Sequence, residues 1–184
     1  EAIEILTEKL NFKPLSFRMI KEIHTETGEE IKKGENVPTH FTFPMFVDLI
    51  VDFIPKNFKE MFGFNPIDEP LLKDVFDKKE YSIIKEFNKK LLLPSPEILL
   101  AMKINALPLR DKEHKRIKDL CDIFALSWYT GINLNEINLS KFISPKKLEL
   151  CLNTITEEDY EKSAYQSGHE KEEVKRVISS VCRY

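Results

Sequence analysis

The feature that most constrains the fold is a helix whose start is marked by the run Ser95-Pro96-Glu97. Serine is a favourable N-cap, proline has the backbone angle of a first helical residue, and a glutamate in the first turn interacts well with the helix dipole. The helix should end before Pro108. We therefore predict a helix over about residues 96–107.

A second helix is predicted over about residues 112–129, and Gly131 would end it. Apolar side chains recur along it at helical spacing, so one face should pack into a core. The stripe consists of Ile117, Leu120, Cys121, Phe124, Ala125 and Trp128.

Residues 131–184 have the pattern of a helical C-terminal segment. Ser144-Pro145 repeats the serine–proline helix start, and Thr156 with Asp159 resembles a capping box. A last amphipathic stripe is formed by Val174, Val177, Ile178 and Val181. We expect this segment to follow a separate domain over residues 1–130.

The first half of the chain has patterns of both helices and strands. Residues 2–10 place apolar side chains at helical spacing, whereas 17–25 and 40–53 are predicted strands joined by the polar run 26–36. Three further segments are less legible: 57–62 as a short helix, and 71–76 and 81–87 as either helix or strand.

Composition excludes several classes of protein. The 184 residues are 42% apolar with 13 Phe, which is too hydrophobic for intrinsic disorder. The longest apolar stretch, residues 41–54, contains Asp48 and Asp52 and is too short for a membrane span, so no membrane partner is expected. A net charge of −3 argues against a wholly basic nucleic-acid-binding surface.

The cysteines, histidines and glycines indicate which kinds of site the chain can form. Three widely separated cysteines and an opening helix instead of a signal peptide indicate reduced thiols in a cytoplasmic protein. The four histidines lack the short spacing of a metal site, and the five glycines form no phosphate-binding loop.

Asp48 is the first residue that suggests chemistry. It lies on a strand face next to Phe46 and Ile50, and an ionised carboxylate among apolar neighbours costs several kcal/mol unless something pairs with it. Asp52 shares that face but lies about 13 Å along the strand, too far for both to bind one ion directly. The alternative is a strand end whose aspartates reach water.

A basic run crosses the two central helices. From Lys103 to Lys118 there are six Lys/Arg against Asp111 and Glu113, a local charge of +4. Such a run fits either a phosphate-binding site or a solvated helix face.

Asp119 and Asp122 lie three residues apart and therefore on one helix face, which should point away from the apolar stripe. Lys115 lies on the same face one turn earlier. The face could carry an exposed Lys–Asp pair, or a Lys/Asp cluster directed at a cleft above the sheet.

Part of this pattern resembles a known family, the nucleotidyltransferases of the abortive-infection AbiEii toxins. The resemblance covers about residues 1–130 and rests on a strand with a carboxylate followed by the helix pair, in that order. The matching residues are Phe46-Val47-Asp48-Leu49-Ile50, then Leu93 to Leu107 with Lys103, then Arg110, Lys118-Asp119 and Asp122.

The resemblance implies an α+β fold of the polymerase-β-like kind, with a small mixed β-sheet flanked by helices and a C-terminal helical segment. It also implies transfer of a nucleoside monophosphate from a nucleoside triphosphate (NTP) bound with Mg²⁺ or Mn²⁺. The acceptor would be an RNA such as tRNA or a protein, and the enzyme would be the toxin of a pair with a cognate antitoxin.

Roles follow for the matching residues. Asp48 would bind the metal or activate the attacking hydroxyl, and Lys103 would contact the triphosphate. Arg110 and Lys118 would help to bind the nucleotide, while Asp119 and Asp122 would order the basic cluster or the site. By this resemblance Asp48, Lys103 and Asp119 are the candidate catalytic residues.

One departure from the family leaves two interpretations of the function open. Its glycine–serine turn and Asp-x-Asp pair normally precede the opening helix, and the printed sequence contains neither. Because the first helix is already under way at Glu1, we expect these motifs upstream, in which case the protein is an enzyme. The alternative is a non-catalytic interaction module that keeps the scaffold.

Overall fold

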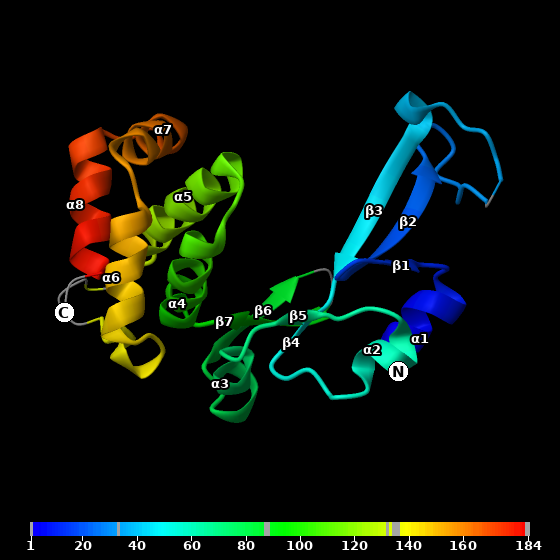
Figure 1. Cartoon of the computed structure of the whole chain (residues 1–184), viewed down its shortest axis with the longest axis horizontal. Coiled ribbons are helices and arrows are strands. Elements are labelled where there is room, and N and C mark those ends of the chain that lie inside the picture. Colours follow the sequence, from blue (N-terminus) through cyan, green and yellow to red (C-terminus); the bar gives the residue numbers. More distant parts are fainter. Residues whose placement is uncertain (1, 33, 87–88, 132, 134–136, 183–184) are drawn as a thin grey trace. The chain divides into compact units, whose positions relative to one another are not determined.

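The computed structural model describes residues 2–32, 34–86, 89–131, 133 and 137–182 (Figure 1). Contacts divide the chain into two compact units, Glu1–Leu72 and Lys73–Tyr184. Both helices and small sheets are present, so the predicted α+β class is confirmed.

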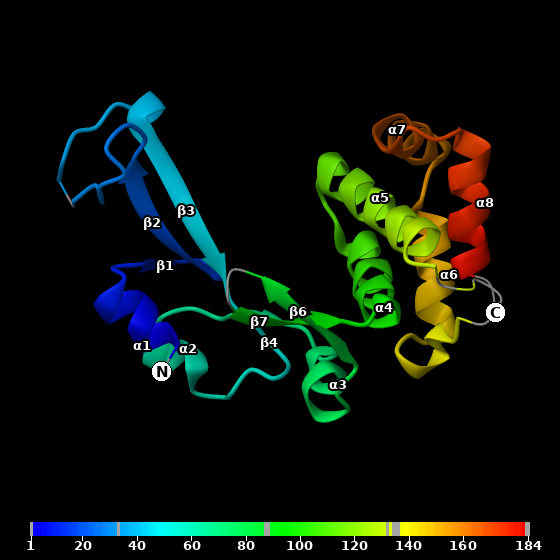
Figure 2. The ribbon, with the colours of Figure 1, turned by 180° about the vertical axis from the view of Figure 1, so that it is seen from behind.

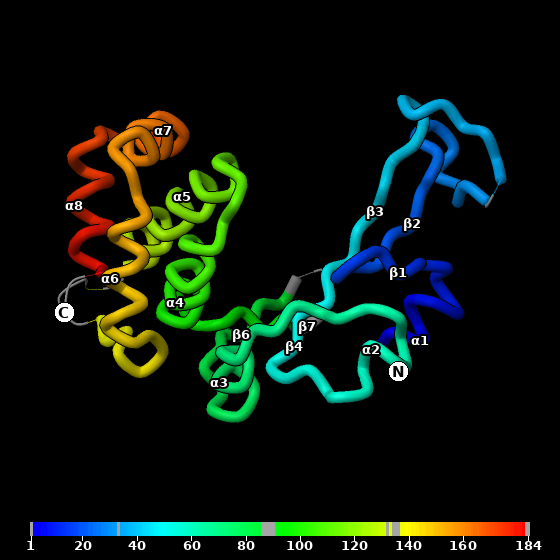
Figure 3. Tube along the Cα trace, in the orientation of Figure 1, coloured from blue at the N-terminus to red at the C-terminus, as the bar shows by residue number. Residues whose placement is uncertain are grey.

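The first unit contains a three-stranded antiparallel sheet. Figure 3 shows the chain trace of its two longer strands side by side. In sheet order the strands are β1 (Lys13–Leu15), β2 (Arg18–His24) and β3 (Thr42–Asp48). The register places Arg18 directly opposite Asp48. Strand β2 lies within the predicted range 17–25.

The predicted continuous strand over 40–53 is wrong. Strand β3 ends at Asp48, and a separate strand β4 (Ile50–Val51) pairs in parallel with β5 (Ile67–Asp68). The residue between them, Leu49, packs against the buried core of this unit while its carbonyl accepts the Ile67 N–H. The chain thus changes its pairing partner at a residue that periodicity alone assigns to the strand.

Short helices cover this unit. They are α1 (Ala2–Glu4), which continues into the π-helical turn η1 (Ile5–Lys9), the 3₁₀ turn η2 (Thr39–Phe41) and α2 (Phe58–Phe62). Phe12, Met19 and Phe64 form the buried core, against which residues of α1, η1, α2 and β3 pack. The predicted helices over 2–10 and 57–62 are therefore present.

The second unit begins with α3 (Leu72–Asp77) and a hairpin of β6 (Tyr81–Glu86) and β7 (Lys89–Pro94). Segment 71–76 is thus helical and segment 81–87 extended, apart from residues 87–88, which lie outside the described residues. Strand β7 was not predicted, because its Lys-Lys-Leu-Leu-Leu-Pro run has no period-2 alternation and its partner lies in another segment.

Helices make up the rest of the unit. They are α4 (Pro96–Ala106), the 3₁₀ turn η3 (Leu107–Leu109), α5 (Glu113–Tyr129), the 3₁₀ turn η4 (Leu139–Lys141), α6 (Pro145–Thr154), α7 (Glu157–Ser167) and α8 (Lys171–Val181). The Ser95 side chain accepts the Ile98 N–H, and Thr156 and Asp159 form a complete capping box. These two predicted helix starts are therefore confirmed by their hydrogen bonds. Helix α6 also begins at Pro145 as predicted, but within the described residues the Ser144 side chain makes no capping hydrogen bond.

Helix α5 is the centre of this unit, because it contacts α4, α7 and α8 (Figure 2). Packing from several sides widens its buried face beyond the predicted stripe, so Ile123 and Ser127 are buried. Trp128, predicted to be in the core, is substantially exposed near the end of the helix. Helix α6 packs onto α4, and α7 and α8 pack onto α5, so the contacts divide the chain after residue 72 and not after residue 130.

Candidate functional site

Four charged side chains converge between α4 and α5. Lys103 on α4 places its Nζ 3.0 Å from Asp119 Oδ1 and 2.6 Å from Asp122 Oδ2, both on α5. Arg110, in the connection between the helices, places its Nε 2.5 Å from Asp119 Oδ2. The arrangement follows from helix geometry, because residues three apart on α5 present their carboxylates to the same side of α4.

Asp119 is the buried member of this cluster, with 4% of its side chain exposed. An ionised carboxylate this deeply buried needs opposite charge, and here each of its oxygens faces a cation. Sequence reasoning placed Asp119 on a face pointing away from the core, with Lys115 as a neighbour. That placement is wrong, since Lys115 is exposed and the partners are Lys103 and Arg110.

Lys103 keeps its charge under these conditions. Burial by itself lowers its pKa, but the hydrogen bonds to Asp122 and Asp119 outweigh that effect and leave the pKa raised. The ammonium has three donors, and the two aspartates accept two of them. One N–H therefore remains for a further acceptor.

A cavity of about 330 Å³ adjoins the cluster, close to the lower limit of typical small-molecule sites. Lys103 and Asp122 lie on its wall. The other lining residues are Leu99, Ala125, Leu126, Tyr129 and Thr130. Two other described cavities, one in each unit, are smaller, at about 150 and 230 Å³.

A second polar array ends at the same cavity. The Tyr129 hydroxyl lies 2.7 Å from His169 Nε2, and the other ring nitrogen of His169 lies 2.7 Å from Glu173 Oε2. Sequence reasoning missed this array, because it considered the histidines only as metal ligands. The four-residue spacing of His169 and Glu173 is a signal that could have found half of it.

The rest of the basic run does not join the cluster. Lys118 is exposed on α5, so its predicted role in nucleotide binding has no support from the geometry around Asp119. Arg116 turns to another carboxylate, Asp159 on α7, with donor–acceptor distances of 2.8 to 3.1 Å.

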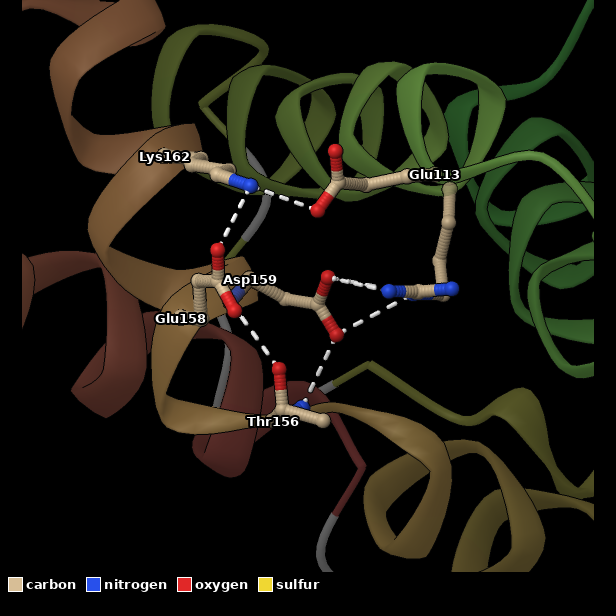
Figure 4. Close-up of polar contacts among 6 residues, drawn as sticks. Glu113, Thr156, Glu158, Asp159 and Lys162 are labelled. Carbon is tan, nitrogen blue, oxygen red and sulfur yellow. Dashed lines mark hydrogen bonds and ion pairs between the residues drawn. The ribbon is translucent and has the colours of Figure 1, made fainter.

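The Arg116–Asp159 pair belongs to a separate network (Figure 4). Asp159 also accepts the Thr156 N–H, and Lys162 bridges Glu113 on α5 and Glu158 on α7. Asp159 is almost completely buried and both of its oxygens accept hydrogen bonds, so this network joins α5 to α7.

Asp48 lies in the first unit, at the end of β3. Its carboxylate is 43% exposed and lies 3.0 Å from Arg18 Nε, and the guanidinium of Arg18 also lies over the rings of Phe17 and Phe46. Of the two alternatives for Asp48, the carboxylate buried on an apolar face is wrong. The other, a strand end whose aspartates reach water, is confirmed, since Asp48 and Asp52 are both exposed.

The predicted site is therefore brought together only in part. Lys103, Arg110, Asp119 and Asp122 converge, whereas Asp48 belongs to the other compact unit.

Metal and membrane features can be stated for the described part of the chain. There, no three His, Cys, Asp or Glu side chains lie together as a metal site. In the same residues no helix combines the length and apolar character that crossing a bilayer requires.

Comparison with known proteins adds no relative. No protein-family model matches the chain. No curated protein and no solved structure matches it either.

Proposed function

We propose that this protein is a nucleotidyltransferase of the AbiEii type, which transfers a nucleoside monophosphate from a metal-bound NTP to an RNA or protein acceptor. One observation carries the proposal: two aspartates of α5 hold the Lys103 ammonium at the wall of a cavity, with the Arg110 guanidinium on the same carboxylate. A toxin role with a cognate antitoxin belongs to the same proposal, through the family resemblance.

The arrangement suits phosphate binding because the cations are held before the ligand arrives. Donors that are already oriented need no reorganisation when charge develops on a leaving pyrophosphate. Among the residues that the structure describes, two carboxylates accept from Lys103, and Arg110 reaches Asp119 through its Nε. One Lys103 N–H and the ends of the Arg110 guanidinium are therefore available for phosphate oxygens.

Asp119 acts here as a positioning residue. Both of its oxygens are engaged by cations and its side chain is buried, so it cannot also contact a metal or the acceptor. Asp122 is more exposed and lies on the cavity wall, where it can accept a hydrogen bond from a ligand.

The metal part of the proposal rests on Asp48. Mg²⁺ is commonly held by one or two carboxylates together with phosphate oxygens and water, so a single aspartate fits one ion but not a pair. A bound divalent ion would neutralise charge on the pyrophosphate. To bind the ion, Asp48 must exchange its ion pair with Arg18 for it.

The proposal is tested by calorimetric titration of the full chain with ATP and Mg²⁺. A charge-assisted hydrogen bond contributes about 1.5–3 kcal/mol, so Lys103→Gln should weaken binding by about 10-fold to 100-fold. Lys147→Gln is the matched control, because Lys147 is an exposed lysine of α6 outside the cluster. Absence of ATP binding, or equal affinity of the Lys103 variant, would refute the proposal.

A second function, a non-catalytic interaction module, is supported by a different observation. Phe43 and Met45 share one face of β3 and both are exposed, and neighbouring exposed apolar side chains often mark contacts with other proteins. Such a module would bind a protein partner and no nucleotide, so the same titration distinguishes the two functions.

A further inference from the structure

Tyr129 is an exposed aromatic residue whose ring is nevertheless held in place. It lies at the C-terminal end of α5 with 66% of its surface exposed. Its hydroxyl is bonded to His169 Nε2, and Glu173 holds the opposite ring nitrogen. The His169 ring packs against Phe124 and Trp128, with centroids 4.7 and 5.6 Å away, so the imidazole is itself anchored.

The position of this ring relative to Lys103 is defined by α5. Tyr129 follows Asp122 by seven residues, which is about two helical turns or about 10 Å along the axis. Both residues line the same cavity, so a ring platform lies at one end and the Lys103–Asp122 pair at the other. Leu99, Ala125 and Leu126 provide apolar wall between them.

We infer that this cavity holds a nucleoside phosphate with its base stacked on Tyr129 and its phosphates at Lys103. The inference rests on the proposed function and adds the base subsite to it. Every nucleobase has a π-face that can stack on an exposed tyrosine, and the apolar wall removes the ring from water. Asp122 lies on the cavity wall beside Lys103, where its carboxylate can accept a hydrogen bond from a sugar hydroxyl.

His169 and Glu173 act as positioning residues in this arrangement. A free tyrosine at a helix end would lose rotamer freedom when a base stacks on it, which weakens binding. The hydrogen bonds that link Tyr129 to His169 and His169 to the Glu173 carboxylate remove much of that freedom beforehand. The array therefore increases affinity for the base without touching the phosphates.

The test compares two ligands, ATP and inorganic triphosphate, in calorimetric titrations of the full chain with Mg²⁺. Tyr129→Ala should weaken ATP binding by about 5-fold to 100-fold, the range measured for the loss of one base–aromatic stack. It should leave the affinity for inorganic triphosphate unchanged, because that ligand has no base. His169→Ala should act on ATP alone in the same way but more weakly.

Two control variants make the outcomes distinct. Tyr129→Phe keeps the ring, so it should lose less ATP affinity than Tyr129→Ala. Tyr165→Ala removes a tyrosine of α7 that is 90% exposed and outside the cavity, so it should change neither affinity.

The inference fails if Tyr129→Ala binds ATP as tightly as the parent protein, or if it weakens ATP and triphosphate equally. In either case the proposed function stands as long as Lys103→Gln weakens both ligands. If the parent protein binds neither ligand, the proposed function and the base subsite are both overturned.

Discussion

Replacing Asp159 by asparagine should destabilise the second unit by about 2–3 kcal/mol. The side chain is 1% exposed and faces the Arg116 guanidinium through Nε and a terminal nitrogen. Removing one partner of a buried ion pair costs about 3–5 kcal/mol. Arg116 is partly exposed and can regain water, so the expected loss of about 2–3 kcal/mol lies at or just below the lower end of that range.

The Asp159→Asn substitution removes the negative charge and leaves the rest of the hydrogen-bond network in place. It has nearly the volume of aspartate, and its carbonyl oxygen can still accept the Thr156 N–H of the capping box. Glu158→Gln, in the same first turn of α7, is the matched control, because Glu158 is exposed and its ion pair with Lys162 contributes at most about 1 kcal/mol.

The assay is urea unfolding followed by helix circular dichroism, repeated over a range of pH. Burial alone raises the pKa of Asp159, but the hydrogen bonds from Arg116 and Thr156 outweigh it and leave the pKa lowered. A lowered pKa contributes stability above the unfolded value of about 3.9, and that contribution is lost as the pH falls through the folded pKa. The difference between parent and Asp159→Asn should therefore be constant at neutral pH and shrink below about pH 4.

Two results would refute this reasoning. A loss of less than about 1 kcal/mol would show that the pair is no stronger than a surface ion pair. A difference that persists unchanged into strong acid would show that the lost stability does not come from the ionised carboxylate.

Three further predictions concern other buried groups. Asp119→Asn should lower the free energy of unfolding in urea by about 2–4 kcal/mol, and Asp122→Asn by less than about 1 kcal/mol, because only Asp119 is buried. Equal losses in the two variants would contradict this. A hydrogen bond with the Cys151 thiol and burial raise the pKa of Cys182. Iodoacetamide should therefore modify Cys182 far more slowly in the native protein than in urea, which mass spectrometry can measure. Similar rates in the two conditions would be evidence against the buried pair. Burial raises the pKa of Tyr160 to about 12, so an ultraviolet titration should show a late tyrosine step that disappears in Tyr160→Phe; a parent titration that is complete near pH 10 would exclude it.

Helix ends were predictable because their causes are local. Ser95 bonds to an N–H three residues away, and Thr156 and Asp159 bond to each other's backbone, so a few consecutive residues contain both partners. The stripe of α8 was predictable for a similar reason, since all four of its valines and isoleucines are buried on one helix face.

Long-range partners were not predictable in the same way. Nothing near Asp119 in the sequence indicates that Lys103, sixteen residues earlier, would neutralise it and allow its burial. The end of β3 at Asp48 depends on where β5 lies, and the opposite Arg18 is thirty residues away.

The sequence by itself determined where the helices of the second half begin, which faces of them are apolar, and that the chain mixes helices with strands, because capping bonds and side-chain periodicity act over a few residues. Only the tertiary structure decided which charges meet. The Lys103–Asp119–Arg110 cluster and the Tyr129–His169–Glu173 array each join separate elements, and packing of α4, α5 and α8 sets those distances.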